Sequence, residues 1–256
     1  ASRLDQHPAR LGRQLREARI AHPHTPGQWR QIALDLVAAY TDSTGGAAQT
    51  DSPNGPQDWF YYFQVTRGVA LREHAMLEGL TPTVFATCLP LRPATAEQRT
   101  RGVACVTADD FRWQKAHIKS ISLLGAVLSR QISYDQGALE TVMFRDGLLS
   151  EAAASNVWVV KDGTVMGPPT NNLVLEGIRY GAIEALCRER GIPFSLRPLR
   201  RDEVLAADEL LLSSATKEVL PVTVLDGRPV GSGQPGPVYQ ALYAGYQRAK
   251  EALFTA

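Results

Sequence analysis

The chain has 256 residues, long enough to bury a substantial core in one large domain or two smaller ones. Its 27 basic and 26 acidic residues nearly balance and form no long block of one sign, which argues against nucleic acid or an anionic membrane as a partner. Three widely spaced cysteines indicate neither a disulfide framework nor a metal site. No apolar run reaches the length of a membrane span, and the charged start does not suit a signal peptide. We therefore expect a cytoplasmic protein with a small-molecule site.

The first 92 residues predict two helices followed by two strands. Apolar residues at helical spacing predict an amphipathic helix from Leu4 to Ile20 and a second helix after the turn at Pro26 and Gly27. Residues 41–58 have the composition of a loop. Aromatic and β-branched residues then predict strands at 59–67 and 83–91.

A polar segment carrying Pro93 follows the second strand and predicts a domain boundary. We expect a linker at residues 93–100, between a small N-terminal domain at 1–92 and a larger C-terminal domain at 101–256. The order of strands and helices is typical of the α+β class, with barrel-like sheets in the larger domain.

The larger domain begins with a strand, GVACVTA, and a helix expected over 120–133. A hairpin follows, with strands at 138–145 and 148–160 around the Asp146-Gly147 turn. The remaining expected elements are helices at 178–190, after Arg201 and at 237–253, and strands at 210–213 and 222–225.

Lysine is scarce enough for the candidates to be compared individually: they are Lys115, Lys119, Lys161, Lys217 and Lys250. Lys119 has an apolar residue before it and an apolar helix after it. Desolvation there would lower the pKa of its amine and leave the free base that Schiff-base chemistry needs. The spacing alone equally describes a helix start whose lysine head lies in water.

Other polar residues suit an anion or a carboxylate. Residues 177–179 open a helix, whose free N–H groups and positive dipole end suit a phosphate, and Thr216 can add a hydroxyl. Arg72 and His74 stand two residues apart, which in extended chain puts both side chains on one side to hold a carboxylate. The plainer interpretation is a pair of solvated loop residues.

Several motifs occur in an order that resembles a known family. HIKSISLLGAVL is followed by LLSEAAASNVWVVKDG, NNLVLEGIR and LLLSSATKEVLPV, and the chain resembles the fold-type IV pyridoxal-phosphate enzymes from about Leu4 to its C-terminus. That family includes D-amino-acid transaminases, branched-chain transaminases and aminodeoxychorismate lyases. The resemblance implies the two-domain D-amino-acid transaminase-like fold, pyridoxal 5'-phosphate bound between the domains, and a homodimer.

The resemblance also implies roles for individual residues. Lys119 would hold the cofactor as a Schiff base and act as general base and acid, and Glu151 would pair with the pyridine nitrogen. Arg72 and His74 are similar to the carboxylate trap of D-amino-acid transaminases. The remaining implied cofactor-binding residues are Arg10, Ser155, Leu175, Gly177, Ile178, Arg179, Ala215 and Thr216.

The implied reaction moves the amino group of a D-amino acid to a 2-oxo acid such as 2-oxoglutarate, in ping-pong order through the Lys119 Schiff base. The alternatives are an aminodeoxychorismate lyase, a branched-chain L-amino-acid transaminase, or a catalytically dead binding protein. Two departures from the family stand out. The sequence starts beyond the family's first strands, and it has alanine at 152–154 where D-amino-acid transaminases often carry serines.

Overall fold

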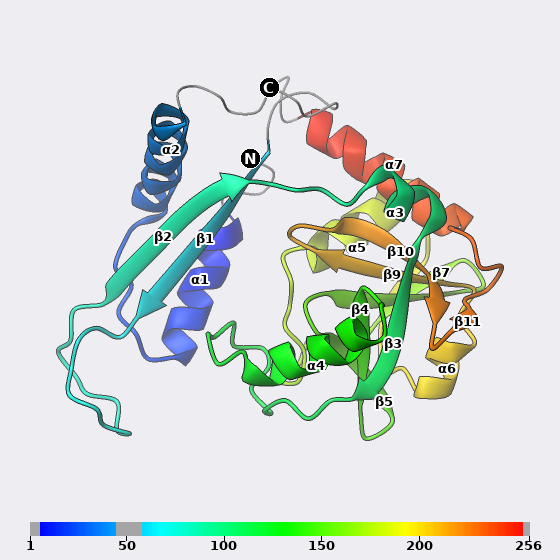
Figure 1. Cartoon of the computed structure of the whole chain (residues 1–256), viewed down its shortest axis with the longest axis horizontal. Coiled ribbons are helices and arrows are strands. Elements are labelled where there is room, and N and C mark those ends of the chain that lie inside the picture. The colour runs from blue at the N-terminus through cyan, green and yellow to red at the C-terminus, as the bar shows by residue number, and fades with distance from the viewer. Residues whose placement is uncertain (1–5, 45–57, 253–256) are drawn as a thin grey trace. The chain divides into compact units, whose positions relative to one another are not determined.

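The computed structural model of the chain describes residues 6–44 and 58–252. The chain forms two compact units, Ala1–Arg92 and Pro93–Ala256 (Figure 1). Residues 93–100, which the composition predicts to be a linker, fall in the second unit and include most of the helix α3 (Ala96–Arg101). This helix begins at a capping box formed by Thr95 and Gln98, which satisfies two backbone N–H groups.

Within its described residues, the first unit contains two strands and two helices, as the sequence predicts. Its elements are α1 (Gln6–Glu17), α2 (Pro26–Ser43), β1 (Trp59–Thr66) and β2 (Thr83–Pro90). The strands are antiparallel, and their register runs from Trp59 opposite Pro90 to Thr66 opposite Thr83. Trp29 on α2 is buried and makes edge contacts with the rings of His24 and Phe63, at centroid distances of 4.8 and 5.2 Å. Leu4 and most of the loop expected at 41–58 lie outside the described residues.

The second unit is built on a mixed sheet, which has nine strands within the described residues. The strands run in the order β5-β4-β3-β10-β9-β6-β7-β8, with β11 paired to β10. Their bounds are β3 (Val103–Asp109), β4 (Glu140–Arg145), β5 (Leu148–Ala152), β6 (Asn156–Lys161), β7 (Thr164–Gly167), β8 (Phe194–Leu196), β9 (Glu209–Ser214), β10 (Glu218–Leu225) and β11 (Arg228–Pro229). Besides α3, its helices are α4 (Leu124–Asp135), α5 (Tyr180–Arg190), α6 (Arg201–Leu205) and α7 (Pro237–Glu251). The expected α+β class is confirmed.

The central strands are apolar on both faces because both faces of the sheet are covered. Along β6, Val157 and Val159 belong to one buried cluster, while Trp158 and Val160 belong to a second. This alternation follows from the two-residue period of a strand. The second cluster is completed by side chains of α5 and α7, such as Ile183. In the described residues, none of the helices combines the length and apolar character needed to span a bilayer.

The strand expected at 148–160 is wrong as a single element. The chain forms β5, leaves the ladder at residues 153–155 and re-enters the sheet as β6. β5 pairs with β4, whereas β6 pairs with β9 and β7. Residues 152–155 are three alanines and a serine, with no glycine or proline to mark a break, so the local sequence could not reveal that the chain changes its partners. This break places Glu151 on one side and Ser155 on the other.

The start of α7 depends on a carboxylate from a distant strand. Glu209 on β9 accepts hydrogen bonds from the backbone N–H groups of Val238 and Tyr239, each at 2.9 Å. Gly236 leaves room for this contact, because a Cβ there would lie 2.2 Å from Cδ of Glu209. The carboxylate also complements the positive end of the helix dipole.

Replacing Glu209 by alanine should lower the free energy of unfolding by about 2 kcal/mol, since one buried and one partly buried N–H group lose a charged acceptor. Urea denaturation measures this change. Glu189→Ala, which removes a largely exposed carboxylate from α5, is the matched control and should change the free energy by less than about 0.5 kcal/mol. Equal effects of the two substitutions would contradict this role of Glu209.

Candidate active site

Glu151 is a buried carboxylate on β5, the end strand of the sheet. The residue is only 4% exposed, so its carboxylate does not face the solvent. Its Oε1 accepts a hydrogen bond from Nη1 of Arg112 at 2.7 Å. Its Oε2 accepts from Nδ2 of Asn156 at 3.2 Å and from the backbone N–H of Leu175 at 3.3 Å. Because a carboxylate has about four acceptor positions, Oε1 can accept one further donor.

A second buried carboxylate orients the guanidinium that holds Glu151. Asp110 accepts from Nε of Arg112 at 2.9 Å and from its Nη2 at 3.0 Å, and Arg145 approaches the same carboxylate at 3.2 Å. Burial tends to raise the pKa of Asp110, but its hydrogen bonds with Arg112 bring that pKa below the usual value. Asp110 and Arg112 were missed from the sequence. The signal was a charged D-x-R triplet just before the Lys119 segment, whose partner lies 39 residues away.

The environment of Glu151 brings its titration close to neutral pH. Burial raises the pKa of Glu151 to about 7, against the charge and hydrogen bond of Arg112, which lower it. A protonated ring nitrogen beside Oε1 would add a second positive group and favour the ionised carboxylate. The site therefore fits a partner that is a cationic hydrogen-bond donor.

Asn156 connects Glu151 to the segment that leads into α5. Its Nδ2 donates to Glu151 and also to the backbone oxygen of Leu175, at 2.9 Å. Gly177 lies against the other end of the same amide, since an added Cβ would be 2.3 Å from Oδ1 of Asn156. The backbone of this segment can approach Asn156 only with glycine at position 177.

The start of α5 is hydrogen-bonded to the turn between β9 and β10. Arg179 precedes the first helical residue and is buried. Its Nε donates to the backbone oxygen of Ser214 and its Nη2 to that of Ala215, both at 3.2 Å, and its guanidinium lies over the ring of Tyr246. The structure thus brings the predicted residues of 177–179 together with Ala215 and Thr216. Free N–H groups at a helix start and a nearby hydroxyl form a donor set that suits a phosphate.

Ser155 takes part in a buried ionic contact that the sequence did not suggest. Its Oγ donates to Oε1 of Glu140 at 2.9 Å and accepts from Nζ of Lys217 at 3.0 Å. Lys217 also donates to Oε1 of Glu140 at 2.9 Å. The sequence around Lys217 gives no sign of this contact, because both of its partners are more than 60 positions away.

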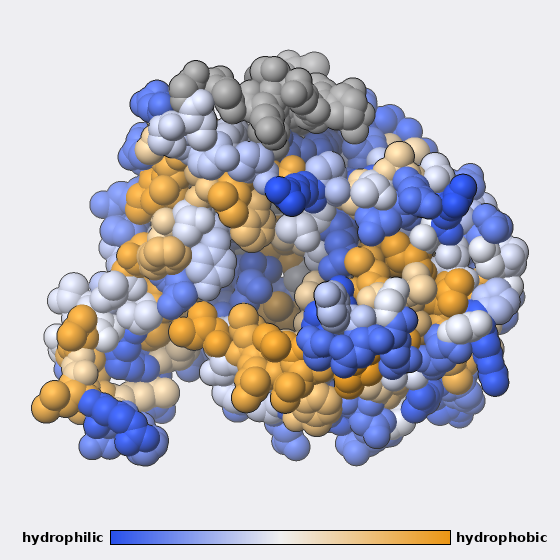
Figure 2. Space-filling model, in the orientation of Figure 1, coloured by the Kyte–Doolittle hydropathy of each residue, from blue (hydrophilic) through white to orange (hydrophobic). Residues whose placement is uncertain are grey.

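The expectation that Lys119 lies in apolar surroundings is wrong for the single chain. Lys119 is exposed, in the loop that precedes α4. The apolar residues near it form an outward face, which we call the α4 surface, between 50% and 72% exposed (Figure 2): Ile121, Leu123, Leu124, Val127 and Leu128. The face of α4 that packs on the sheet instead carries Ser129 and Ser133, and Ser129 accepts a hydrogen bond from Thr141 of β4 through its backbone oxygen. Helical spacing correctly grouped the apolar residues but could not show which face the sheet covers.

The loop that carries Lys119 is tied to the same segment that holds Glu151. The backbone oxygen of Asn172 faces both the N–H and Nδ1 of His117, at 3.4 and 3.3 Å. The amide of Asn172 donates to the backbone oxygen of Gln114 at 2.8 Å. Three residues later, Leu175 donates to Glu151. The 171–175 segment therefore contacts both the Lys119 loop and the Glu151 carboxylate.

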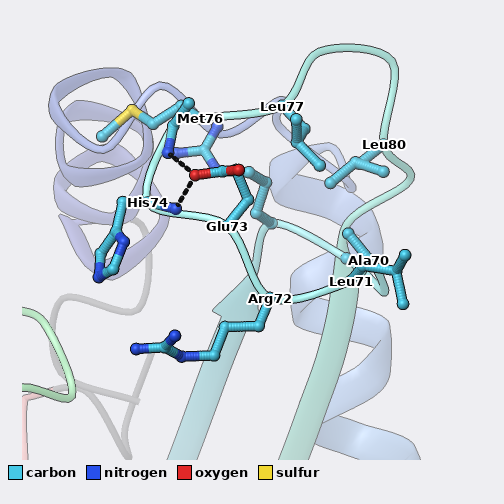
Figure 3. A pocket seen from close by; sticks show the side chains of 11 residues that line it. Ala70, Leu71, Arg72, Glu73, His74, Met76, Leu77 and Leu80 are labelled. Carbon is cyan, nitrogen blue, oxygen red and sulfur yellow. Dashed lines mark hydrogen bonds between the residues drawn. The ribbon is translucent and has the colours of Figure 1, made fainter.

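In the first unit, Arg72 and His74 lie on an irregular loop between β1 and β2. Residues of this loop line a cavity of about 380 Å³. Figure 3 shows the side chains of Arg72 and His74 extending to the same side, whereas the carboxylate of Glu73 accepts from the backbone N–H groups of His74 and Ala75. Arg10 is half-buried on α1. The roles expected for these three residues, Arg10, Arg72 and His74, stay predictions.

The residues of the second unit fit pyridoxal phosphate chemically. Glu151 offers a buried anion with one acceptor position, and the start of α5 with Thr216 offers donors for a phosphate. Gly177 keeps the intervening backbone close. Among the described residues, no group of three or more His, Cys, Asp or Glu side chains could hold a metal ion.

The raised pKa of Glu151 predicts a pH dependence of stability. The folded protein without added cofactor binds this proton more tightly than the unfolded chain does, so the contribution of Glu151 is fully present below about pH 4.5 and falls as the pH rises through about 7. Relative to Glu151→Gln, the free energy of unfolding of the wild type should therefore decrease by roughly 1–3 kcal/mol between pH 4.5 and 7.5. Urea denaturation at each pH measures this, with Glu189→Gln as a surface control. A free energy of unfolding that increases with pH for the wild type, relative to Glu151→Gln, would contradict the raised pKa.

Comparison with known proteins identifies the family. The model of the family "Amino-transferase class IV" matches residues 1–225. A D-alanine aminotransferase of Bacillus licheniformis is 36% identical over 246 residues, which cover 96% of this chain and 82% of that protein. A fold IV-transaminase from Curtobacterium pusillum is 26% identical with a TM-score of 0.76, covering 94% of this chain and 80% of that one. The holo form of a branched-chain amino acid aminotransferase from Thermobaculum terrenum gives a TM-score of 0.79 at 22% identity, covering 96% and 77%. The chain therefore belongs to the class IV amino-transferases, which are pyridoxal-phosphate-dependent enzymes.

Proposed function

We propose that this aminotransferase moves the amino group of a D-amino acid to a 2-oxo acid such as 2-oxoglutarate. The observation that carries the transamination is the buried Glu151 carboxylate, held by Arg112 and retaining an acceptor position for a cationic ring nitrogen. The D-amino acid is supported by the D-alanine aminotransferase that is 36% identical to the chain, and by the presence of Arg72 and His74 on one loop.

Pyridoxal phosphate, when bound, supplies a carbonyl carbon for the amino group and a ring that accepts electrons. Glu151 keeps the ring nitrogen protonated, and Arg112 keeps that carboxylate oriented. The amine of Lys119 would take the proton from the substrate Cα and return it to the carbon that the cofactor's carbonyl supplies, on the other side of the transferred nitrogen, acting as base and then acid. Arg72 and His74 bind the substrate carboxylate, because a guanidinium and an imidazole both donate to it.

The phosphate is held by donors from three elements of the chain. Residues 177–179 present backbone N–H groups at the start of α5, Thr216 presents its hydroxyl, and Arg10 supplies a positive charge. Ser155 and Leu175 complete the cofactor contacts. Each of these roles is assigned by the proposal and tested by substitution.

We further propose that the enzyme is a homodimer assembled through the α4 surface. This surface is apolar and exposed in the single chain, and a contiguous patch of this kind marks a site of association. A second copy covering it would exclude water from the neighbourhood of Lys119, whose amine must act as a base. We place the enzyme in the cytoplasm, where its three buried thiols, Cys88, Cys105 and Cys187, stay reduced.

The enzyme loaded with pyridoxal phosphate should form pyruvate continuously from D-alanine and 2-oxoglutarate, and should stop after one turnover when the oxo acid is omitted. Lys119→Ala should reduce turnover by at least about 10³-fold, since it removes the general base and acid. Lys161→Ala is the matched control, because Lys161 is half-exposed in a surface pair with Asp208, and it should leave turnover unchanged. Coupled lactate dehydrogenase detects the pyruvate.

Other outcomes of the same assay would replace the proposal. Turnover of L-leucine but not D-alanine would identify a branched-chain transaminase. Pyruvate released from aminodeoxychorismate without an acceptor would identify a lyase. Protein that develops no visible cofactor band would instead be a binding protein.

The dimer should separate when charge is placed on the α4 surface. Leu124→Glu combined with Val127→Glu should change the mass in solution from twice 27.9 kDa to 27.9 kDa, because burying two carboxylates costs more than the contact provides. Light scattering coupled to size exclusion measures the mass. Leu205→Glu, on the exposed side of α6, is the control and should leave the dimer intact. A wild-type mass of 27.9 kDa would contradict the dimer.

A further inference from the structure

Lys217, Glu140 and Ser155 form a closed ionic triangle in the second unit. Lys217 ends the turn between β9 and β10, Glu140 begins β4, and Ser155 immediately precedes β6. Each pair is joined by a hydrogen bond of 2.9 or 3.0 Å. The Glu140 side chain is fully buried and that of Lys217 is 20% exposed. Three segments far apart in the sequence thus meet at one ion pair.

The burial of Glu140 holds the lysine in place. Oε1 of Glu140 accepts hydrogen bonds from both Lys217 and Ser155, and Oε2 accepts one from the backbone N–H of Ala154 at 3.3 Å. A carboxylate without solvent contact is costly unless a cation pairs with it. The lysine side chain, which is flexible at a surface, therefore has one favoured arrangement here.

The triangle lies next to the turn to which the proposed function assigns the phosphate. On one side, Arg179 holds the backbone oxygens of Ser214 and Ala215. On the other side, the backbone N–H of Lys217 donates to Oγ of Ser214 at 3.1 Å, while its amine reaches Glu140. Thr216 lies between these two attachments.

The same triangle is connected to the strand that carries Glu151. The backbone oxygen of Ser155 accepts from the N–H of Ala152, the neighbour of Glu151, at 2.8 Å. Residues 152–155 therefore bridge the Glu151 carboxylate and the triangle. Displacement of Lys217 would release both the Thr216 turn and the end of this bridge.

We propose that Lys217 is a positioning residue for phosphate recognition: its ion pair with Glu140, shared with Ser155, fixes the Ser214–Lys217 turn at the distance from Glu151 that one cofactor requires. The inference rests on the proposed function, because it assumes that Thr216 binds the phosphate. Lys217 acts through the turn and does not itself contact the cofactor.

Binding of pyridoxal phosphate and of pyridoxal to the cofactor-free full chain tests the inference, because the two aldehydes differ only in the phosphate. Lys217→Met should weaken pyridoxal phosphate about tenfold, a typical effect of removing an outer partner of a ligand-binding group. It should change the affinity for pyridoxal by less than about twofold, so that the preference for the phosphorylated aldehyde falls. Absorbance titration measures both dissociation constants. Lys161→Met is the control and should change neither.

Two further variants separate positioning from folding. Lys217→Met combined with Glu140→Gln removes both charges, so no uncompensated carboxylate stays buried, and should show the same loss of preference. Lys217→Arg keeps the charge and should restore most of it. An unchanged preference in the double variant, or an equal loss for both aldehydes, would overturn the inference. Failure of the wild type to bind pyridoxal phosphate would instead overturn the proposed function.

Discussion

The buried ion pair between Glu151 and Arg112 is the interaction on which the site depends. A carboxylate on an end strand would ordinarily face water, and here it is buried because Arg112 neutralises it and Asp110 orients Arg112. Burial raises the pKa of Glu151 to about 7, so the protonation state of its carboxyl group near neutral pH changes when a cation is placed beside it. A protonated pyridine nitrogen is such a cation, and its attraction to the carboxylate is strongest where water is excluded.

The interruption between β5 and β6 at residues 153–155 places further side chains around this ion pair. By changing partners between β5 and β6, the chain places Glu151 against Arg112 on one side of the break and Ser155 against Glu140 and Lys217 on the other. Asn156, the first residue of β6, then reaches back to Glu151 and forward to Leu175. Within six positions of the chain, Glu151, Ser155 and Asn156 thus contact the segments that carry Arg112, Lys217 and Leu175.

The sequence predicted those features that depend on local periodicity or on motifs. The helices of the first unit, the β1 and β2 strands, α5 and the turn at Asp146 and Gly147 follow from nearby residues and are confirmed. The family was also accessible from the motifs around Lys119, Glu151, Gly177 and Thr216, and it is confirmed. These predictions required no knowledge of which distant segments meet.

The errors concern long-range contacts and burial. The absence of glycine and proline from 148–160 hid the change of partner at residues 153–155, and the leucines of α4 suggested a buried face although its serines pack on the sheet. Arg112 and Lys217 each find their carboxylate partner at a separation that no local pattern encodes. The apolar surface beside Lys119 is exposed in the single chain, and the proposed homodimer would cover it.

The proposed activity depends most on the pairing of Glu151 with the cofactor ring. A crystal structure of the enzyme with pyridoxal phosphate tests it directly. We expect the pyridine nitrogen about 2.7–2.9 Å from Oε1 of Glu151, with Arg112 still in place and electron density joining the Lys119 amine to the cofactor. A ring nitrogen facing solvent, or a cofactor attached to Lys217, would contradict the account.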